Sequence, residues 1–210
     1  MEAFKKFRGV VATLERANVD TDQIIPKQFL KSIERTGFGP ALFFDWRYLK
    51  DGSGDPAFEL NDPLRAGASV LVTGNNFGCG SSREHAVWAV QQYGFKAVIA
   101  PRRGDAQKLI PGFADIFKNN SYGNGLLAIE LSTDEVNWIF AAAKGRKLEA
   151  TVDLAAQTVT VHGAEERVFT FDITSDVKEK LLSGLDAIGL TLAHEAEIAA
   201  FEAKHDVQMA

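Results

Sequence analysis

The segment from Ser69 to Ala100 constrains the fold of this chain more than any other. It begins with the apolar run SVLVT and ends with the apolar run KAVIA, each of which is typical of a short buried strand. Between them lie a glycine-containing turn and an apolar pattern at helical spacing that reaches Tyr93, and Gly94 predicts the end of that helix. The order strand, turn, helix, strand predicts a βαβ unit with two parallel strands.

The pattern of the remaining chain extends this unit into one mixed α/β domain, which we expect to span residues 1–210. Further strands are predicted at residues 4–14, 126–131, 148–161 (as a hairpin) and 168–173. Further helices are predicted at residues 113–120, 132–144, 176–182 and 192–204, the second of them opened by an S-x-x-E capping box at Ser132. Residues 31–63 form a long loop rich in aromatic side chains, and such loops commonly fold over a core or line a site.

Charge and composition argue against several classes of function. The chain has 23 basic and 28 acidic residues, so bulk electrostatics does not favour binding to nucleic acid. It has no run of eighteen apolar residues and no uninterrupted apolar leader, which predicts a cytoplasmic protein without a membrane segment. Its single cysteine, Cys79, excludes an internal disulfide, and four histidines without ligand spacing cannot complete a metal site. A metal that takes part in the chemistry must therefore come from another chain.

The turn after the first strand of the βαβ unit reads NNFGCGSSREH, from Asn75 to His85. Its glycines and serines offer free N–H groups at a helix N-terminus, where the helix dipole favours an anion. Arg83 adds a fork-shaped cation suited to a carboxylate or a phosphate, so the turn predicts a site for an anionic ligand. The P-loop pattern, the third glycine of a dinucleotide motif and the G-x-S-x-G elbow are all absent, which leaves little support for a nucleotide site or a hydrolase.

A structural interpretation of the same residues competes with this one. The run from Ser81 to Glu84 fits S-x-x-E, in which the serine hydroxyl and the glutamate carboxylate cap the helix reciprocally. Cys79 lies where a helix N-terminus and Arg83 would lower its thiol pKa, although a small residue in a tight turn is the favoured interpretation. His85 lies one helical turn beyond Ser81 and either acts as a base or packs against its neighbours.

Several longer motifs carry a resemblance to a known family. The run GSSREH at residues 80–85 resembles the signature of the swivelling domain of the aconitase superfamily. Four other stretches resemble the bacterial small subunits of 3-isopropylmalate dehydratase: RANVDTDQIIPKQFLKSIERTGFG (16–39), LFFDWRYL (42–49), FADIFKNNSYGNGLL (113–127) and GLDAIGLTLAHE (184–195). The resemblance runs nearly end to end and implies a single swivelling β/β/α domain with a mixed sheet, like the C-terminal domain of aconitase.

The resemblance implies a hydro-lyase of leucine biosynthesis that interconverts 2-isopropylmalate and 3-isopropylmalate by dehydration and rehydration. It implies no cofactor in this chain and a large-subunit partner that carries a 4Fe-4S cluster, without which the chain is inactive. The chemistry is consistent, because a dicarboxylic hydroxy acid needs cations for its carboxylates, a Lewis acid for its hydroxyl and a base for its C–H group. Small subunits acting on citraconate with 2-methylmalate or on homoaconitate, and a binding module without catalysis, are the alternatives.

The resemblance also implies roles for residues of the turn. Ser81 takes the role of the base as an alkoxide, Ser82 helps to hold that oxyanion or a substrate oxygen, and Arg83 binds a substrate carboxylate. Because capping and catalysis compete for one serine oxygen, the alternative for Ser82 is that it caps the helix. Asp22 matches an aspartate that orients the arginine side of the site, and its alternative interpretation is a turn residue or an N-cap.

The loop from Lys31 to Leu49 resembles the specificity region of the family. Arg35 and Arg47 are its candidate carboxylate ligands. Three aromatic residues are candidates to line an apolar slot for the isopropyl group, although aromatics at such spacing more often pack in a core: Phe43, Phe44 and Trp46. The chain departs from the family pattern at residues 102–112, RRGDAQKLIPG, where an insertion follows a strand on the side of the sheet where α/β sites gather.

Overall fold

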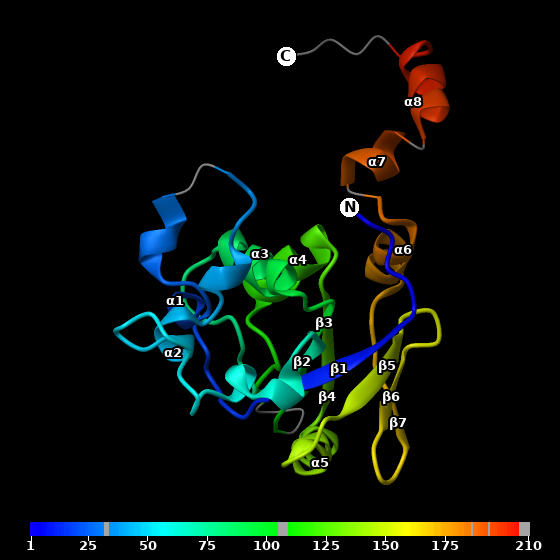
Figure 1. Cartoon of the computed structure of the whole chain (residues 1–210). Helices are drawn as coiled ribbons and strands as arrows, with labels where there is room; N and C mark the ends of the chain where they lie inside the picture. Colours follow the sequence, from blue (N-terminus) through cyan, green and yellow to red (C-terminus); the bar gives the residue numbers. More distant parts are fainter. Residues whose placement is uncertain (32–33, 105–108, 186, 193, 206–210) are drawn as a thin grey trace.

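A computed structural model describes residues 1–31, 34–104, 109–185, 187–192 and 194–205. The described residues form a mixed seven-stranded sheet with the order β4-β3-β2-β1-β5-β6-β7 (Figure 1). Its strands are β1 (Phe7–Leu14), β2 (Ala68–Thr73), β3 (Ala97–Arg102), β4 (Leu127–Ser132), β5 (Glu149–Asp153), β6 (Thr158–His162) and β7 (Arg167–Thr170). Strands β1 to β4 pair in parallel, whereas β5, β6 and β7 continue the sheet from β1 in antiparallel order. The predicted α/β class with a mixed sheet is confirmed.

The predicted βαβ unit is present as β2, helix α3 (Glu84–Tyr93) and β3. Its two strands pair in parallel, with Val70 opposite Ala97. Strands β2 and β3 are almost wholly buried, as expected for parallel strands covered on both faces. Helices α3 and α4 (Asp115–Asn124) lie on one side of them, and α5 (Thr133–Ala143) lies on the other (Figure 1).

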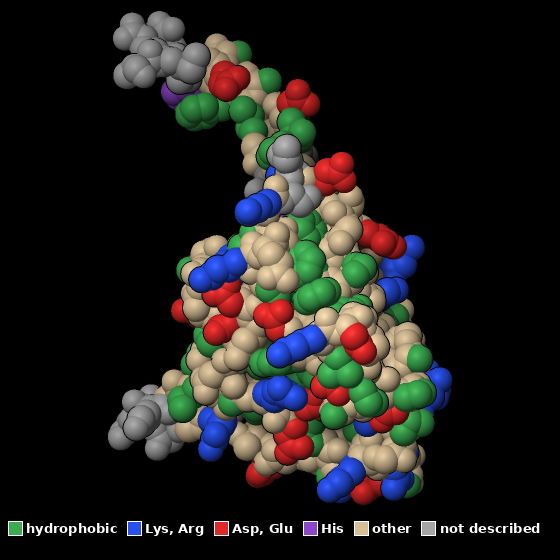
Figure 2. Space-filling model, turned by 60° about the vertical axis from the view of Figure 1, so that its left-hand side comes forward, with side chains coloured by type: hydrophobic (Ala, Val, Ile, Leu, Met, Phe, Trp, Pro, Cys, Tyr) green, Lys and Arg blue, Asp and Glu red, His purple; other side chains and the backbone are tan. Residues whose placement is uncertain are grey.

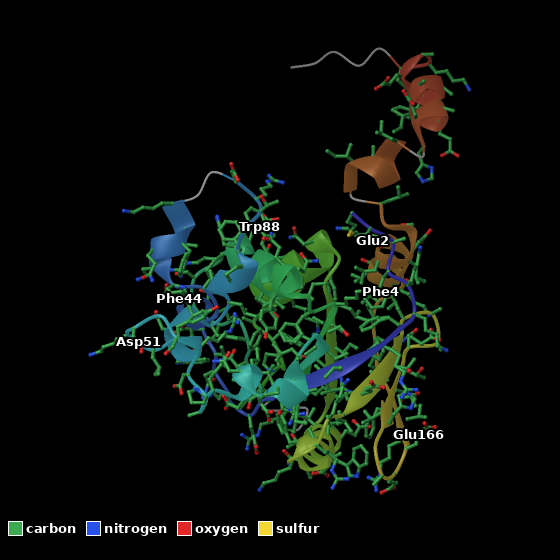
Figure 3. All side chains as sticks on the ribbon, in the orientation of Figure 1. Glu2, Phe4, Phe44, Asp51, Trp88 and Glu166 are labelled. Carbon is green, nitrogen blue, oxygen red and sulfur yellow. The ribbon has the colours of Figure 1, made fainter. Side chains whose placement is uncertain are left out.

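Helix α5 begins at the capping box that the sequence predicts. The Ser132 hydroxyl accepts a hydrogen bond from the Glu135 N–H, and the Glu135 carboxylate accepts one from the Ser132 N–H at 2.8 Å. Two helices are predicted after the last strand, but the described residues contain three: α6 (Ser175–Ser183), α7 (Ala187–Leu192) and α8 (Glu195–Glu202). Phe4 lies beside α6, where its N–H donates to the Leu181 carbonyl (Figure 3). Helices α7 and α8 extend away from the body, so they form an arm (Figure 1).

The loop predicted at residues 31–63 consists of a series of single helical turns in its described part. Residues 32–33 lie outside the described residues. The turns in this loop and just before it are α1 (Thr21–Ile24), η1 (Lys27–Lys31), η2 (Gly39–Ala41), α2 (Phe44–Arg47), η3 (Glu59–Asn61) and η4 (Pro63–Arg65). The Phe43 ring is fully buried and stacks on Trp46, so its expected place in a substrate slot is wrong. Phe44 is partly exposed and packs on Phe29 beside α1 (Figure 3).

The segment at residues 102–112, which the resemblance predicts to be an insertion and which is called the insertion below, has described ends that pair with each other, while residues 105–108 lie outside the described residues. Arg103 and Ile110 exchange two backbone hydrogen bonds of 2.9 and 2.7 Å. The Gly112 N–H then donates to the Glu130 carboxylate on β4 at 2.7 Å. The insertion therefore returns to the sheet at a fixed point.

Basic and acidic side chains are interspersed on the face of the molecule shown in Figure 2, without a continuous basic patch among the residues drawn in colour. Within the described ranges, no helix is long and apolar enough to cross a membrane.

Candidate active site

The turn after β2 is held on one side by the segment after β1. The Gly78 N–H donates to the Val19 carbonyl at 2.8 Å, and the Thr21 N–H donates to the Cys79 carbonyl at 2.9 Å. Each bond joins residues that follow the carboxyl end of a parallel strand. This is the edge of the sheet at which α/β proteins usually place their sites.

The other side of the turn is held by the end of the insertion. The Phe77 N–H donates to the Gly112 carbonyl at 2.9 Å, and the Ala114 N–H donates to the Phe77 carbonyl at 3.0 Å. Backbone groups from three separate segments therefore fix the path of the turn. The insertion, whose role the sequence leaves open, supplies one of these segments.

Gly78 is required by both its conformation and its neighbour. Its φ of +76° lies in the left-handed region, and a Cβ at this position would lie 2.2 Å from the Phe117 ring on α4. The absence of a side chain lets α4 approach the turn closely.

The capping box predicted at Ser81 is wrong. Helix α3 begins at Glu84 with Arg83 as its N-cap residue, and no side chain caps it. An N-cap residue gives its carbonyl to the first intrahelical bond, but the Ser81 carbonyl accepts from the Thr21 hydroxyl at 3.0 Å. The Glu84 carboxylate instead accepts from the Asn124 amide on α4 at 3.0 Å. Within the described part of the chain the exposed Ser81 and Ser82 hydroxyls make no hydrogen bond, so both are free to act on a ligand.

Arg83 is held by an ion pair with Asp22, the second residue of α1. The Arg83 side chain is 13% exposed and that of Asp22 is 43% exposed, so the pair lies at the mouth of the site. The hydrogen bond from Arg83 holds the pKa of Asp22 below its ordinary value. Asp20, not Asp22, is the N-cap of α1, which rules out the N-cap alternative for Asp22. The contact is the one expected if Asp22 orients Arg83.

A cavity of about 250 Å³ opens at this point. It is lined by Thr21, Gly78, Gly80, Ser81, Arg83 and the first turn of α4 with its preceding residue, 114–117. Cavities that enclose a drug-sized ligand usually measure about 300–1,000 Å³. This one lies just below that range, which suits a smaller ligand such as a small acid.

Arg35 does not line this cavity. Its guanidinium lies 5.6 Å from the centre of the ring of Trp88, which is labelled in Figure 3. The Arg35 carbonyl accepts from the Gln92 side chain at 2.7 Å. The His85 ring packs between Phe38 and Trp88, at 5.2 and 4.7 Å between centroids, so the packing interpretation of His85 is the one that the geometry favours.

Arg47 also lies away from the residues that line the cavity. Its guanidinium lies 5.1 Å from the Tyr48 ring and 4.7 Å from the Tyr93 ring, and one amino group donates to the Leu42 carbonyl at 3.4 Å. Its Nε is buried without a hydrogen-bond partner in the described residues. The substrate roles of Arg35 and Arg47 stay predictions.

For Cys79 the structure supports the favoured interpretation, a small residue in a tight turn, and not the alternative of a lowered thiol pKa. Burial of the thiol, and then the negative charge of Asp20, raise its pKa above the ordinary value. The raised pKa gives no support to a reactive thiolate at Cys79. Among the described residues, no group of three or more His, Cys, Asp and Glu side chains is arranged to hold a metal ion.

Thr21 is the site residue that sequence reasoning missed. No local pattern marks it, because its hydroxyl bonds to a carbonyl 60 residues away. The only signal is its position between Asp20 and Asp22, in the polar loop after the first strand.

Comparison with known proteins identifies the family. Residues 1–134 match the family model of the aconitase C-terminal domain, and residues 188–209 match the model of the C-terminal domain of 3-isopropylmalate dehydratase small subunits. The chain is 55% identical over 210 residues to the 3-isopropylmalate dehydratase small subunit of Desulforapulum autotrophicum, covering 100% of this chain and 98% of that protein. The chain belongs to the 3-isopropylmalate dehydratase small subunits. The family resemblance seen in the sequence is thereby confirmed.

Other 3-isopropylmalate dehydratase small subunits agree. That of Rhodopirellula baltica is 54% identical and that of Halalkalibacterium halodurans is 52% identical, each covering at least 96% of this chain and 98% of the relative. A crystal structure of 3-isopropylmalate dehydratase from Methanocaldococcus jannaschii superposes with a TM-score of 0.63 at 23% identity, covering 93% of this chain and 99% of that chain. This likeness confirms the fold.

Proposed function

We propose that this chain contributes Ser81, Ser82 and Arg83 to the active site of a 3-isopropylmalate dehydratase, a hydro-lyase that interconverts 2-isopropylmalate and 3-isopropylmalate. One observation carries the proposal: Ser81, whose hydroxyl has no partner among the described residues, and a guanidinium fixed by Asp22 line the same cavity. A free oxygen beside a fixed cation is the arrangement that proton abstraction from a dicarboxylic acid requires.

Ser81 is the proposed base. In dehydration its oxygen takes the proton from the substrate C–H group beside a carboxylate, and in hydration it returns that proton. A serine hydroxyl is too weak an acid to ionise at neutral pH by itself, so the oxyanion needs a nearby cation and N–H donors. Arg83 and the backbone N–H groups of the turn are the candidates for this stabilisation. Ser82 is placed next in the chain to hold the same oxyanion or a substrate oxygen.

Arg83 is the proposed carboxylate ligand. A guanidinium has five N–H donors, and the described bond to Asp22 uses one of its amino groups. The other donors remain for a substrate carboxylate, which a planar guanidinium binds in a two-pronged fashion. Asp22 thus fixes the plane of the Arg83 guanidinium without using all of its N–H donors.

The proposed partner is the large subunit, with a 4Fe-4S cluster that supplies a Lewis acid for the substrate hydroxyl. Two features of this chain support a shared site. Ser81 and Ser82 are exposed, and the Arg83–Asp22 pair beside them is partly exposed. The complex is proposed to close over this face of α1, α3 and α4. A cytoplasmic location stays a prediction.

The segment at residues 31–63 is proposed to set substrate specificity. Its partly exposed aromatic residues Phe44 and Trp46 and its two arginines, Arg35 and Arg47, are the candidates. In this proposal Arg35 and Arg47 bind carboxylate only in the complex, because in the free chain both guanidinium groups lie against aromatic rings.

The test mixes the purified chain with a cluster-loaded large subunit and follows dehydration of 3-isopropylmalate and of 2-methylmalate. We expect turnover of 3-isopropylmalate, and none in a matched complex that carries Ser81→Ala. A preference for 2-methylmalate would assign the chain to citraconate chemistry. Complex formation without turnover of either acid would leave a binding module, and near-normal turnover by Ser81→Ala would remove Ser81 from the role of the base.

A further inference from the structure

Thr21 holds the turn on both sides of Gly80. Its N–H donates to the Cys79 carbonyl at 2.9 Å, and its hydroxyl donates to the Ser81 carbonyl at 3.0 Å. The residue is 2% exposed and lines the cavity together with Ser81. The side chain and the backbone of Thr21 therefore fix the carbonyl groups of the two residues on either side of a single glycine.

Gly80 is the residue of the turn whose backbone conformation its own side chain restricts least. Gly80 has a φ of +89°, and glycine populates both signs of φ about equally. A rotation at Gly80 would move Ser81 relative to Arg83. The bond from Thr21 to the Ser81 carbonyl opposes this rotation from outside the turn.

Helix α1 is itself well fixed. Asp20 and Gln23 form a reciprocal capping box, in which the Gln23 N–H donates to the Asp20 carboxylate at 2.8 Å. The residue after Thr21, Asp22, holds Arg83. Two adjacent residues of a capped turn thus contact the two groups proposed to carry the chemistry.

We propose that Thr21 is a positioning residue of this enzyme: its hydroxyl fixes the backbone of Ser81 so that the Ser81 oxygen faces the substrate carbon. The inference rests on the proposed function, because it assigns Ser81 the reacting oxygen. Thr21 acts through Ser81 and does not exchange a proton with the substrate.

The decisive comparison is between Thr21→Val and Thr21→Ser. Valine keeps the shape of threonine and the N–H bond to Cys79 but lacks the hydroxyl, whereas serine keeps the hydroxyl. Displacing a reacting group by about 1 Å costs on the order of 100-fold in rate. In the complex with the large subunit we expect Thr21→Val to lower kcat for 3-isopropylmalate by about 10–100-fold, with KM nearly unchanged, and Thr21→Ser to restore kcat.

Thr73→Val is the matched control. Thr73 is fully buried at the end of β2, and its hydroxyl donates to a carbonyl at 3.4 Å, but that carbonyl belongs to Arg16 and not to the turn. We expect this variant to keep the kcat of the original chain. Equal losses in Thr73→Val and Thr21→Val, or an unchanged kcat in Thr21→Val, would overturn the proposal.

Hydrogen exchange on the isolated full chain gives a readout that does not depend on turnover. We expect the amides of residues 79–83 to exchange faster in Thr21→Val than in the original chain, and at the original rate in Thr21→Ser and Thr73→Val. Unchanged exchange in Thr21→Val would overturn the proposal that the Thr21 hydroxyl fixes the turn. If thermal unfolding shows that Thr21→Val does not fold, Thr21→Ala serves as the second variant without a hydroxyl. Should the original complex turn over no acid, the proposed function fails, while the exchange experiment still decides whether Thr21 fixes the turn.

Discussion

Asp22 and Arg83 form an ion pair although 61 residues separate them in the chain. Replacing Asp22 by Asn keeps the shape but removes the charge that fixes the guanidinium. Because the pair is partly exposed, we expect a moderate loss, roughly tenfold in kcat/KM for 3-isopropylmalate. Asp134→Asn is the control, since Asp134 also lies in the first turn of a helix, α5, and is exposed without an ion pair among the described residues. Equal kcat/KM in both variants would show that Asp22 does not orient Arg83.

The same pair gives a pH expectation. The Arg83 hydrogen bond lowers the pKa of Asp22 from 3.8 in the folded chain. A group whose folded-state pKa is lowered stabilises the fold fully above its unfolded pKa and loses this effect as the pH falls through the folded-state value. The contribution of Asp22 to stability should therefore be constant above about pH 5 and disappear in acid. Unfolding of Asp22→Asn and the original chain, measured from pH 7 down to pH 3, should differ less at pH 3; a difference that grows toward acid would contradict this.

Two serines in S-x-x-E patterns should differ in their effect on stability. Ser132 caps α5, so Ser132→Ala should lower the free energy of unfolding by about 1 kcal/mol. The Ser81 hydroxyl has no partner in the described residues, so Ser81→Ala should change it by less than about 0.5 kcal/mol. Denaturant unfolding of both variants checks this. A Ser81→Ala loss as large as that of Ser132→Ala would restore the capping role.

Cys79 should react slowly with thiol reagents. Burial and the charge of Asp20 raise its pKa, and the thiolate is the reactive form. At pH 8 we expect iodoacetamide to modify the folded chain at least about tenfold more slowly than the urea-unfolded chain, as followed by mass spectrometry. Equal rates would mean that the thiol is neither shielded nor kept neutral.

Glu130 should couple the insertion to the site. Its carboxylate accepts from the Gly112 N–H at 2.7 Å and from Lys118 at 2.6 Å, and the Gly112 carbonyl in turn accepts from Phe77 in the turn. Glu130→Gln keeps an oxygen for Gly112, whereas Glu130→Ala leaves that N–H without its partner at a cost of about 1–3 kcal/mol. We expect Ala to be clearly less stable than Gln and to have faster hydrogen exchange at residues 111–114. Equal stability of the two variants would show that the Gly112 bond contributes nothing.

The arm of α7 and α8 should be dispensable for folding of the body. Helix α8 buries no residue, and Ile188 on α7 is 70% exposed. A chain that ends at Gly184 should melt within about 2 °C of the full chain by circular dichroism. Leu181→Ala is the contrast, since this α6 side chain is fully buried and its loss should cost about 2–5 kcal/mol. A truncated chain that melts much lower would place the arm in the folded core.

The parts of the fold that sequence predicts are those set by neighbouring residues. Strand β2, the stop of α3 at Gly94 and the Ser132 cap follow from local periodicity and turn chemistry. The S-x-x-E pattern at Ser81 fails because a distant hydroxyl, that of Thr21, already bonds the Ser81 carbonyl. Phe43 could not be separated from a ligand-lining residue for the same reason, since its burial depends on Phe58 and Phe77.

Strand β1 separates a parallel half of the sheet, which carries the site, from an antiparallel half, which does not. Every residue that lines the Ser81 cavity comes from positions 21–117, on the parallel side, while β5, β6 and β7 contribute none of these residues. Substitutions in the antiparallel strands should therefore leave the residues of the cavity unchanged, as long as the apolar side chains on the buried face of these strands are preserved. A change of substrate between relatives has to be sought in the parallel half, and the β6–β7 hairpin is a rational position for a label or a peptide insertion.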